Sequence, residues 1–325
     1  MFALWKRYRH IAAAAPLILA TIATAAAQAP YPNRNITLVL PFAAGSGTDT
    51  TTRLIGKELG TALGVSTVID NKAGANGSIA ASFVARAPAD GYTLFVTTNT
   101  THSANPYLLK TMSYDPIKDF TPIARTGDLP FMLVIHPDIP VNSVAELIAL
   151  AKKEPGKYSY ASGSSSASVS GATFARLAGI DLLHVPYKSS PPALTDVIAG
   201  RVSMMFIDVP TGLPHVNGKA LKALAVTTKK PSALLPDLPT MDNTVKGFDI
   251  TSWQGYLGPA NMPKDIVVKL NAEIRKIIER PDIKNQLAER GMEAFSGTPE
   301  EFDAFLKEQL VLWEKLIADA GIEKQ

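Results

Sequence analysis

The expected fold class follows from one run of residues: Ile36-Thr37-Leu38-Val39-Leu40-Pro41-Phe42-Ala43-Ala44-Gly45-Ser46-Gly47-Thr48-Asp49. Its first five residues are largely apolar and read as a buried strand that Pro41 ends. From Thr48 onward, apolar side chains recur at the spacing of a helix, at Leu54, Ile55, Leu59 and Leu63. A strand that runs through a glycine-rich turn into a helix is the opening unit of an α/β fold.

The turn itself has the composition of an anion site. Gly45 and Gly47 let backbone N–H groups face a ligand, and the start of the following helix carries a partial positive charge. An ordinary capped helix, with Thr48 or Asp49 satisfying backbone donors, fits the same spacing. Thr50 stands where a dinucleotide-binding turn has its third glycine, so that class of site is not expected.

The same alternation of strands and helices continues along the chain. Further strands are expected over 65–69, 93–97, 131–135, 158–161, 184–187, 202–207 and 221–227. Further helices are expected over 79–86, 143–153, 263–279, 283–289 and 300–318. This order predicts α/β lobes with largely parallel sheets, and about 300 residues are enough for two of them.

A second strand-to-helix turn lies in the other half of the chain: Tyr160-Ala161-Ser162-Gly163-Ser164-Ser165-Ser166-Ala167-Ser168. Serine hydroxyls both donate and accept, so they can cap the helix or hold a carboxylate. A flexible surface loop is the other interpretation, although regular elements flank this one closely. One helix start in each half of the chain would suit a ligand with a carboxylate at one or both ends.

The N-terminal segment indicates export. Lys6, Arg7 and Arg9 precede an alanine-rich apolar run over 11–26, and Ala25-Ala26-Ala27 suits signal peptidase, with Gln28 as the first mature residue. The run is too short and too rich in alanine for a membrane anchor. The chain has no cysteine, which excludes disulfides, thiolate chemistry and a lipid anchor on a thiol.

Composition argues against nucleic acid and against catalysis. The chain has 32 basic and 29 acidic side chains, and the three excess charges belong to the export segment, so the mature protein is near neutral. The histidines are scattered, Ala167 breaks a nucleophile-elbow pattern, and no phosphate-binding Gly-Lys-Ser or Gly-Lys-Thr sequence occurs. Asp49 and Asp208 could form an acid/base pair, but a cap and a loop-ordering role suit them better. We expect no catalytic residue, no cofactor and no metal.

Many short motifs resemble, in order, those of the periplasmic receptors of tripartite tricarboxylate transporters, the Bug family. The opening turn is similar to the family's PFxxGGxxD, and the later matches are Asp70-Asn71-Lys72-Ala73-Gly74-Ala75-Asn76-Gly77, Asp90-Gly91-Tyr92-Thr93-Leu94, Tyr114-Asp115-Pro116-Ile117-Lys118-Asp119-Phe120-Thr121-Pro122, Tyr160-Ala161-Ser162, His184-Val185-Pro186-Tyr187-Lys188, Pro192-Ala193-Leu194-Thr195-Asp196, Leu238-Pro239-Thr240 and Gly258-Pro259-Ala260. The resemblance covers nearly the whole mature chain.

This resemblance implies a type II periplasmic-binding fold, in which two α/β lobes close around a central cleft. Lobe 1 would hold 31–127 plus 247–325, and lobe 2 would hold 128–246. The ligand carboxylate would be held by backbone N–H groups and water rather than by arginine. The implied ligand-binding residues are Phe42, Gly45, Ser46, Gly47, Thr48, Asp49, Thr98, Asn99, Thr101, Ser162, Ser164, Ser165, Ser166, Tyr187 and Asp208.

The ligand and the output stay open in the sequence. Ser164, Ser165 and Ser166 replace the Gly-Asn-Gly-like run common in the family, so tricarboxylates, dicarboxylates, acidic amino acids and aromatic carboxylates all remain candidates. Phe42, Met204 and Met205 could pack an aromatic ring. The implied partner is a membrane permease, and the protein is expected to be a monomer. The alternatives are a receptor that signals through a two-component system and a hydrolase that uses the serine loop.

Overall fold

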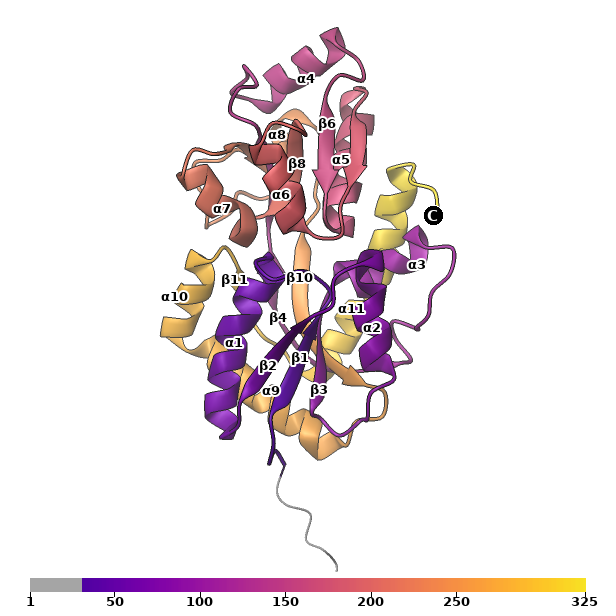
Figure 1. Cartoon of the computed structure of the whole chain (residues 1–325), viewed down its shortest axis with the longest axis vertical. Helices are drawn as coiled ribbons and strands as arrows, with labels where there is room; N and C mark the ends of the chain where they lie inside the picture. The colour runs from indigo at the N-terminus through magenta and orange to yellow at the C-terminus, as the bar shows by residue number, and fades with distance from the viewer. Residues whose placement is uncertain (1–30) are drawn as a thin grey trace, which may run out of the picture. The chain divides into compact units, whose positions relative to one another are not determined.

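Two β-sheets organise the computed structural model, which describes residues 31–325 as one compact unit (Figure 1). The first sheet has the order β11-β4-β10-β3-β1-β2, formed by Glu293–Ala294, Phe120–Leu129, Ser252–Pro259, Thr93–Thr98, Ile36–Leu40 and Thr67–Asn71. The second has the order β7-β6-β8-β5-β9, formed by Leu183–Pro186, Ser159–Ser162, Met204–Asp208, Phe131–Ile135 and Lys222–Val226. The expected export signal and its cleavage near Ala27 lie outside the described residues.

The two sheets follow one plan. In the first, β1 pairs in parallel with β2 and β3, and in the second, β6 pairs in parallel with β7 and β8. In each sheet, the strand that comes directly after a crossing from the other sheet is antiparallel to both of its neighbours. This strand is β10 in the first sheet and β5 in the second. The α/β class and the two-lobed architecture are confirmed. The expectation of largely parallel sheets is wrong, because five of the nine strand pairings in the described residues are antiparallel and both sheets are mixed.

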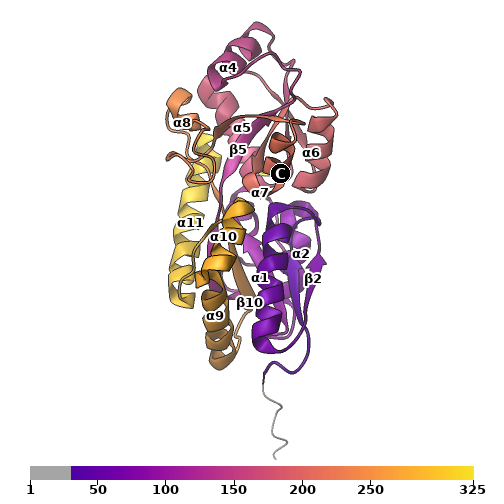
Figure 2. The ribbon, with the colours of Figure 1, turned by 90° about the vertical axis from the view of Figure 1, so that its left-hand side faces the viewer.

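Helices cover both sheets. In the first lobe they are α1 Gly47–Leu63, α2 Ser78–Ala85, α3 Asn105–Leu108, α9 Lys264–Glu279, α10 Pro281–Glu289 and α11 Pro299–Asp319, with a 3₁₀ turn Ala75–Gly77 and a π-helical turn Thr100–Ala104. In the second they are α4 Val144–Lys153, α5 Ser165–Ala178, α6 Ser190–Ile198, α7 Val209–Asn217 and α8 Met241–Thr244. Figure 2 shows α1, α9 and α10 on one side of the first lobe.

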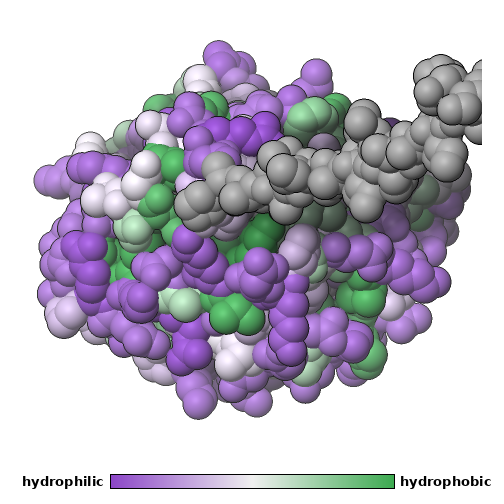
Figure 3. Space-filling model, turned by 90° about the horizontal axis from the view of Figure 1, so that it is seen from below, coloured by the Kyte–Doolittle hydropathy of each residue, from purple (hydrophilic) through white to green (hydrophobic). Residues whose placement is uncertain are grey.

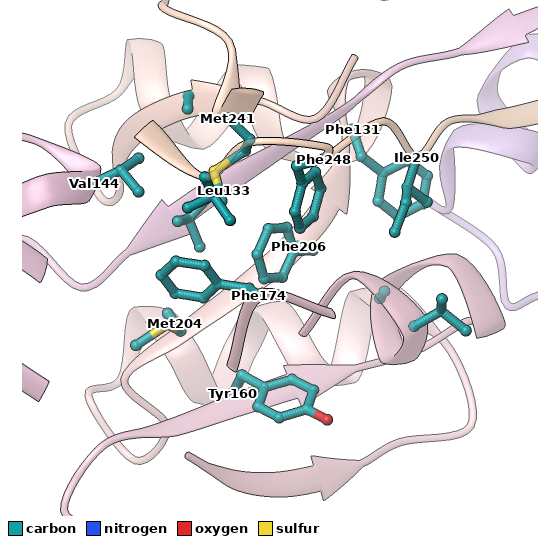
Figure 4. Close-up of a cluster of buried hydrophobic side chains, with 14 of the residues drawn as sticks. Phe131, Leu133, Val144, Tyr160, Phe174, Met204, Phe206, Met241, Phe248 and Ile250 are labelled. Atoms are coloured by element: carbon teal, nitrogen blue, oxygen red, sulfur yellow. The ribbon is translucent and has the colours of Figure 1, made fainter. Parts of the chain in front are cut away.

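Each sheet is apolar on both faces, as sheets covered by helices on both sides require. Along β5, Phe131, Leu133 and Ile135 enter the cluster that contains Phe174 of α5 (Figure 4), whereas the alternate residues pack with α6. Met204 and Met205 on β8 divide between the same two clusters and are fully buried. Neither methionine is among the residues that line the cleft described below, so neither is placed there to pack an aromatic ligand.

The chain crosses between the sheets at two places. Pro130 alone separates β4 from β5, and the return passes through the segment that ends at Thr251, just before β10. The predicted boundaries at 127/128 and 246/247 lie close to these crossings and remain predictions. The end of α11 does not keep to the first lobe, because Trp313 and Ile317 pack in the main apolar cluster of the second sheet.

The free end of the first lobe is predominantly hydrophilic where it is not covered, with scattered hydrophobic side chains (Figure 3). Among residues 31–325, no helix combines the length and the apolar character needed to cross a membrane.

Candidate functional site

The first helix start is shaped by its own loop. Gly45 has a φ of +82°, a conformation that glycine adopts without strain, and this turns the chain toward α1. Ser46 then caps the helix, its hydroxyl accepting from the backbone N–H of Asp49 at 3.3 Å. The backbone N–H groups of Gly47 and Thr48, the first two residues of α1, therefore lie where the loop ends and have no acceptor within the helix.

Asp49 holds this loop rather than facing the cleft. Its carboxylate accepts from the backbone N–H of Gly45 at 3.0 Å, from Arg53 through two bonds of 2.9 Å and from Asn71 at 3.1 Å. Burial alone would raise the pKa of Asp49, but these hydrogen bonds and the Arg53 charge outweigh it and lower the pKa below its usual value. Asp49 is only 2% exposed, so the ionised carboxylate orders the turn from within.

Replacing Asp49 by Asn should loosen the loop while leaving the fold intact. The variant loses the charge that Arg53 pairs with and part of the acceptor capacity, which we expect to cost about 2 kcal/mol of unfolding free energy at pH 7. Because the folded pKa is lowered, the wild-type contribution is present above about pH 4 and is lost as the pH falls through the folded value. Urea unfolding at pH 7 and pH 3 measures this, and an equal difference between the two proteins at both pH values would contradict it.

The second helix start is built in the same way. Strand β6 ends at Ser162, and Ser164 caps α5 by accepting from the backbone N–H of Ala167 at 3.3 Å. Between them, a Cβ at Gly163 would lie 2.2 Å from backbone atoms of Ser189 and Ser190. Only glycine lets these two loops of the second lobe approach so closely, and their contact fixes where α5 begins.

Each helix start takes a polar group from the opposite lobe. The carboxylate of Asp208, at the end of β8, lies against the start of α1, where a Cβ on Gly47 would be 2.1 Å from Oδ1 and the backbone N–H of Gly47 acts to lower the pKa of Asp208. In the reverse direction, the backbone N–H of Ser165 at the start of α5 donates to the hydroxyl of Thr100 at 3.3 Å. The two lobes therefore meet through their helix N-termini, which is the geometry of an anion site divided between them.

Two further hydrogen bonds cross the same boundary. The amide of Asn99 donates to the hydroxyl of Ser166 at 2.8 Å and accepts from Ser252 at 2.5 Å. The backbone N–H of Ala43 donates to the hydroxyl of Ser189 at 3.1 Å. The contacts that cross the boundary are polar and join backbone N–H groups and small side chains, so parting the lobes would expose groups that water can satisfy.

A small cavity lies at this boundary. The centre of a water molecule can occupy about 20 Å³ of it, room for about one water. The predicted residues that line it are Phe42, Ser46, Gly47, Thr48, Thr98, Ser164 and Asp208. Sequence reasoning missed the other lining residues, which are Thr100, Leu129, Phe131, Ser190 and Ser252. Leu129, Phe131 and Ser252 belong to the crossing strands, so the floor of the cavity is the connection between the lobes.

The remaining predicted residues lie around the cavity without lining it. These are Gly45, Asp49, Asn99, Thr101, Ser162, Ser165, Ser166 and Tyr187. Ser162 pairs with His184 at 2.7 Å, and the hydroxyl of Tyr187 donates to Asp196 at 2.5 Å. Both pairs border a neighbouring hollow that Ser164 also lines, on the outer side of the start of α5.

Asp208 dominates the electrostatics of the cavity. It is 7% exposed, and burial raises its pKa, although hydrogen bonds from Thr211 and from the backbone of Gly47 act in the opposite direction. Of the described residues that line the cavity, Asp208 alone is ionisable. Within 31–325, no cluster of three or more His, Cys, Asp and Glu side chains is arranged to hold a metal. The arrangement can bind an anion through backbone N–H groups and hydroxyls.

Comparison with known proteins gives a consistent picture. The sequence profile described as "Tripartite tricarboxylate transporter family receptor" matches residues 51–322. A protein of Pseudomonas sp. (strain P51), named for the tcbD-tcbE intergenic region, is 34% identical over 96% of this chain and 94% of its own. Protein BugT of Bordetella pertussis is 30% identical over 92% of this chain and 95% of its own.

Three solved structures share the fold over nearly all the described residues. Rpa4515 of R. palustris with adipate has a TM-score of 0.89 at 36% identity, covering 91% of this chain and all of its own. The periplasmic binding protein BugD has a TM-score of 0.86 at 34% identity, again over 91% and 100%. MatC of Rhodopseudomonas palustris with bound malate has a TM-score of 0.81 at 30% identity, over 88% and 100%.

Proposed function

Since the chain belongs to the receptor family of tripartite tricarboxylate transporters, we propose that it captures a small organic carboxylate between its lobes and delivers it to a membrane permease. The family consists of periplasmic solute-binding proteins and not of enzymes. The relatives with adipate and malate bind carboxylates, which supports a carboxylate as the ligand here.

The observation that carries the proposal is the pair of helix starts that face each other across the cavity. Each lies against an acceptor from the opposite lobe: the start of α1 is in close contact with the carboxylate of Asp208, and the backbone N–H of Ser165 donates to the hydroxyl of Thr100. An organic acid offers carboxylate oxygens as acceptors for the same donors, and a helix start stabilises an anion by about 0.3–1 kcal/mol, up to ~2 when partly buried. No lysine or arginine is needed for this mode of binding.

Entry of the ligand requires the lobes to part. About 20 Å³ accommodates one water and no organic acid. Pro130 and the segment before Ser252 join the two sheets, and α11 runs from the first lobe into the main apolar cluster of the second, so we assign the opening motion to these three crossings. Closure around the acid would then replace the direct contact between the start of α5 and Thr100 by contacts that run through the ligand.

The proposed ligand-binding set keeps the sequence prediction and adds the missed lining residues. Residues that line the cavity would touch the ligand, whereas Asp49 and Thr101 would act by holding the loops. Export by a signal peptide cleaved near Ala27 is part of the same proposal, supported by the basic residues and the apolar run that precede it.

Thermal unfolding of the mature protein against a panel of acids tests the function. The panel contains succinate, malate and aspartate; adipate and 2-aminoadipate; tricarballylate and citrate; benzoate and 3-hydroxybenzoate. An acid that binds only the folded state adds about 2.7 kcal/mol at a hundredfold excess over Kd, so the midpoint should rise on the order of 5 °C.

Ligand carried over from the host must be removed before this measurement. The protein is unfolded, dialysed and refolded, and the released small molecules are identified by mass spectrometry. A shift with at least one acid, or an organic acid among the released molecules, supports the proposal. No shift together with no released acid would overturn it.

A further inference from the structure

Asp208 is held in one orientation by the second lobe. Its Oδ1 accepts from the backbone N–H of Thr211 at 3.0 Å and from the Thr211 hydroxyl at 2.5 Å, which makes it the cap of α7. The carboxylate also reaches the start of α1, where a Cβ on Gly47 would lie 2.1 Å from Oδ1. A buried carboxylate fixed from two sides is a permanent part of the cleft and not a mobile surface charge.

Four helices begin around the cavity: α1, α5, α6 and α7. Pro191 and Pro192, the second and third residues of α6, have no N–H group to offer an anion. The other three helix starts are not equally supplied with negative charge. The Asp208 carboxylate caps α7 and lies in close contact with the start of α1. The start of α5 receives only neutral acceptors, the hydroxyls of Ser164 and Thr100. Each helix start is equivalent to about half a positive charge. The positive ends of α1 and α7 and the hydrogen bonds from Thr211 favour the ionised form of Asp208 against the rise in pKa that burial causes. The protein therefore supplies an anion on the α1 and α7 side and leaves the α5 side for the carboxylate of the ligand.

A second ligand carboxylate on the α1 side would meet Asp208 at short range in a buried site. Like charges at such distances repel strongly because water is excluded. A hydroxyl or ammonium group at the same place would instead donate to Asp208. Both bonds from Thr211 end on Oδ1, and a carboxylate offers about four acceptor positions on its two oxygens.

We propose that Asp208 is a specificity-determining residue: it makes the cleft prefer an organic acid that presents a hydroxyl or ammonium donor beside its carboxylate over the unsubstituted acid of the same skeleton. This inference rests on the proposed function and states which members of the carboxylate class are selected. Asp208 acts by direct contact with the ligand donor, and the α5 start holds the ligand carboxylate.

Affinities of skeleton-matched acids test the inference in wild type and Asp208→Asn. Asparagine is a good helix cap, so the variant can keep α7 while it removes the charge and replaces one acceptor oxygen by an NH2 donor. Titration calorimetry compares succinate with malate and aspartate, adipate with 2-aminoadipate, tricarballylate with citrate, and benzoate with 3-hydroxybenzoate. Glu154→Gln, which removes a partly exposed charge from the second lobe at the end of α4, is the matched control.

In the skeleton that binds best, wild type and the Glu154→Gln control should prefer the donor-bearing acid by roughly tenfold or more, and Asp208→Asn should remove most of that preference. The unsubstituted acid should bind Asp208→Asn more tightly than it binds wild type. An unchanged preference in Asp208→Asn, or a wild type that prefers the unsubstituted acid, would overturn the inference while leaving the receptor function intact. Absence of binding by any acid to either protein, together with no organic acid among the molecules released from the purified protein, would instead refute the proposed function, and the inference with it.

Discussion

Gly47→Ala should fold normally and bind its acid about tenfold to a hundredfold more weakly than wild type. Gly47 is the first residue of α1 and does not use a positive φ, so alanine suits its backbone. In the closed cleft, however, the new Cβ would lie 2.1 Å from Oδ1 of Asp208 and 3.2 Å from Cβ of Pro210. Overlap of this kind in a packed site costs about 1–3 kcal/mol, which corresponds to a loss of affinity of about tenfold to hundredfold. The penalty applies only when the lobes meet.

A double-mutant cycle with Asp208→Ala locates the cause. Removing the carboxylate takes away the two shortest contacts of the methyl group that Gly47→Ala introduces, so this substitution should lose much less affinity in the Asp208→Ala background. The midpoint of thermal unfolding without ligand should be unchanged or slightly higher for Gly47→Ala alone, since alanine restricts the unfolded chain. Equal losses of affinity in both backgrounds would show that the methyl group acts elsewhere than on the Asp208 contact.

Helices and strands whose apolar residues keep one regular spacing from end to end could be predicted from the sequence. Strand β5 and the helices α4, α9 and α11 lie within about two residues of their predicted ranges, since each combines a regular apolar pattern with clear end signals. The strands β4 and β10, the longest in the molecule as described, were missed. The register between them shifts at two points, and Gly127, with a φ of +147°, and Gly258 break the alternation that identifies a strand.

The candidate site was predictable where it depends on the local chain and unpredictable where it depends on the other lobe. The two helix starts were predicted from their turns, and a serine cap was expected for the second, where Ser164 is found. The cap of the first was wrong: Ser46 caps α1 by accepting from the N–H of Asp49, whereas Thr48 or Asp49 was expected to act as the cap. That Asp208 reaches the start of α1, however, depends on how the two sheets are joined, which no local pattern encodes. Asp49 illustrates the same limit, because its partner Asn71 comes from the next strand and turns a candidate ligand contact into a loop support.

Because of His102, the free energy of unfolding of the receptor should decrease when the pH is lowered from 7.5 to 5. Its ring is fully buried in the π-helical turn, with Nδ1 2.6 Å from the Thr97 hydroxyl and Phe120 packed edge-on at 4.6 Å between ring centres. Burial lowers the pKa of His102 from 6.5 to about 3. Between these values the unfolded chain binds a proton that the folded protein does not, so the unfolding free energy decreases as the pH falls. From pH 7.5 to pH 5 this amounts to about 2 kcal/mol.

Replacing the titrating ring is the test of this linkage. His102→Phe keeps an aromatic ring beside Phe120, and His102→Gln keeps a polar group for Thr97. Each variant therefore preserves a contact that the other removes, so a folding defect in one need not occur in the other. Urea unfolding measures the free energy of unfolding at pH 7.5 and at pH 5. Its decrease between the two pH values should be smaller by about 2 kcal/mol in either folded variant than in wild type. His215→Gln, in a partly exposed position on α7, should behave like wild type. If the variants lose as much unfolding free energy between pH 7.5 and pH 5 as wild type does, the pKa of His102 is not lowered in the folded protein. His102 would then be protonated in the folded state, with its charge stabilised by neighbouring acceptors.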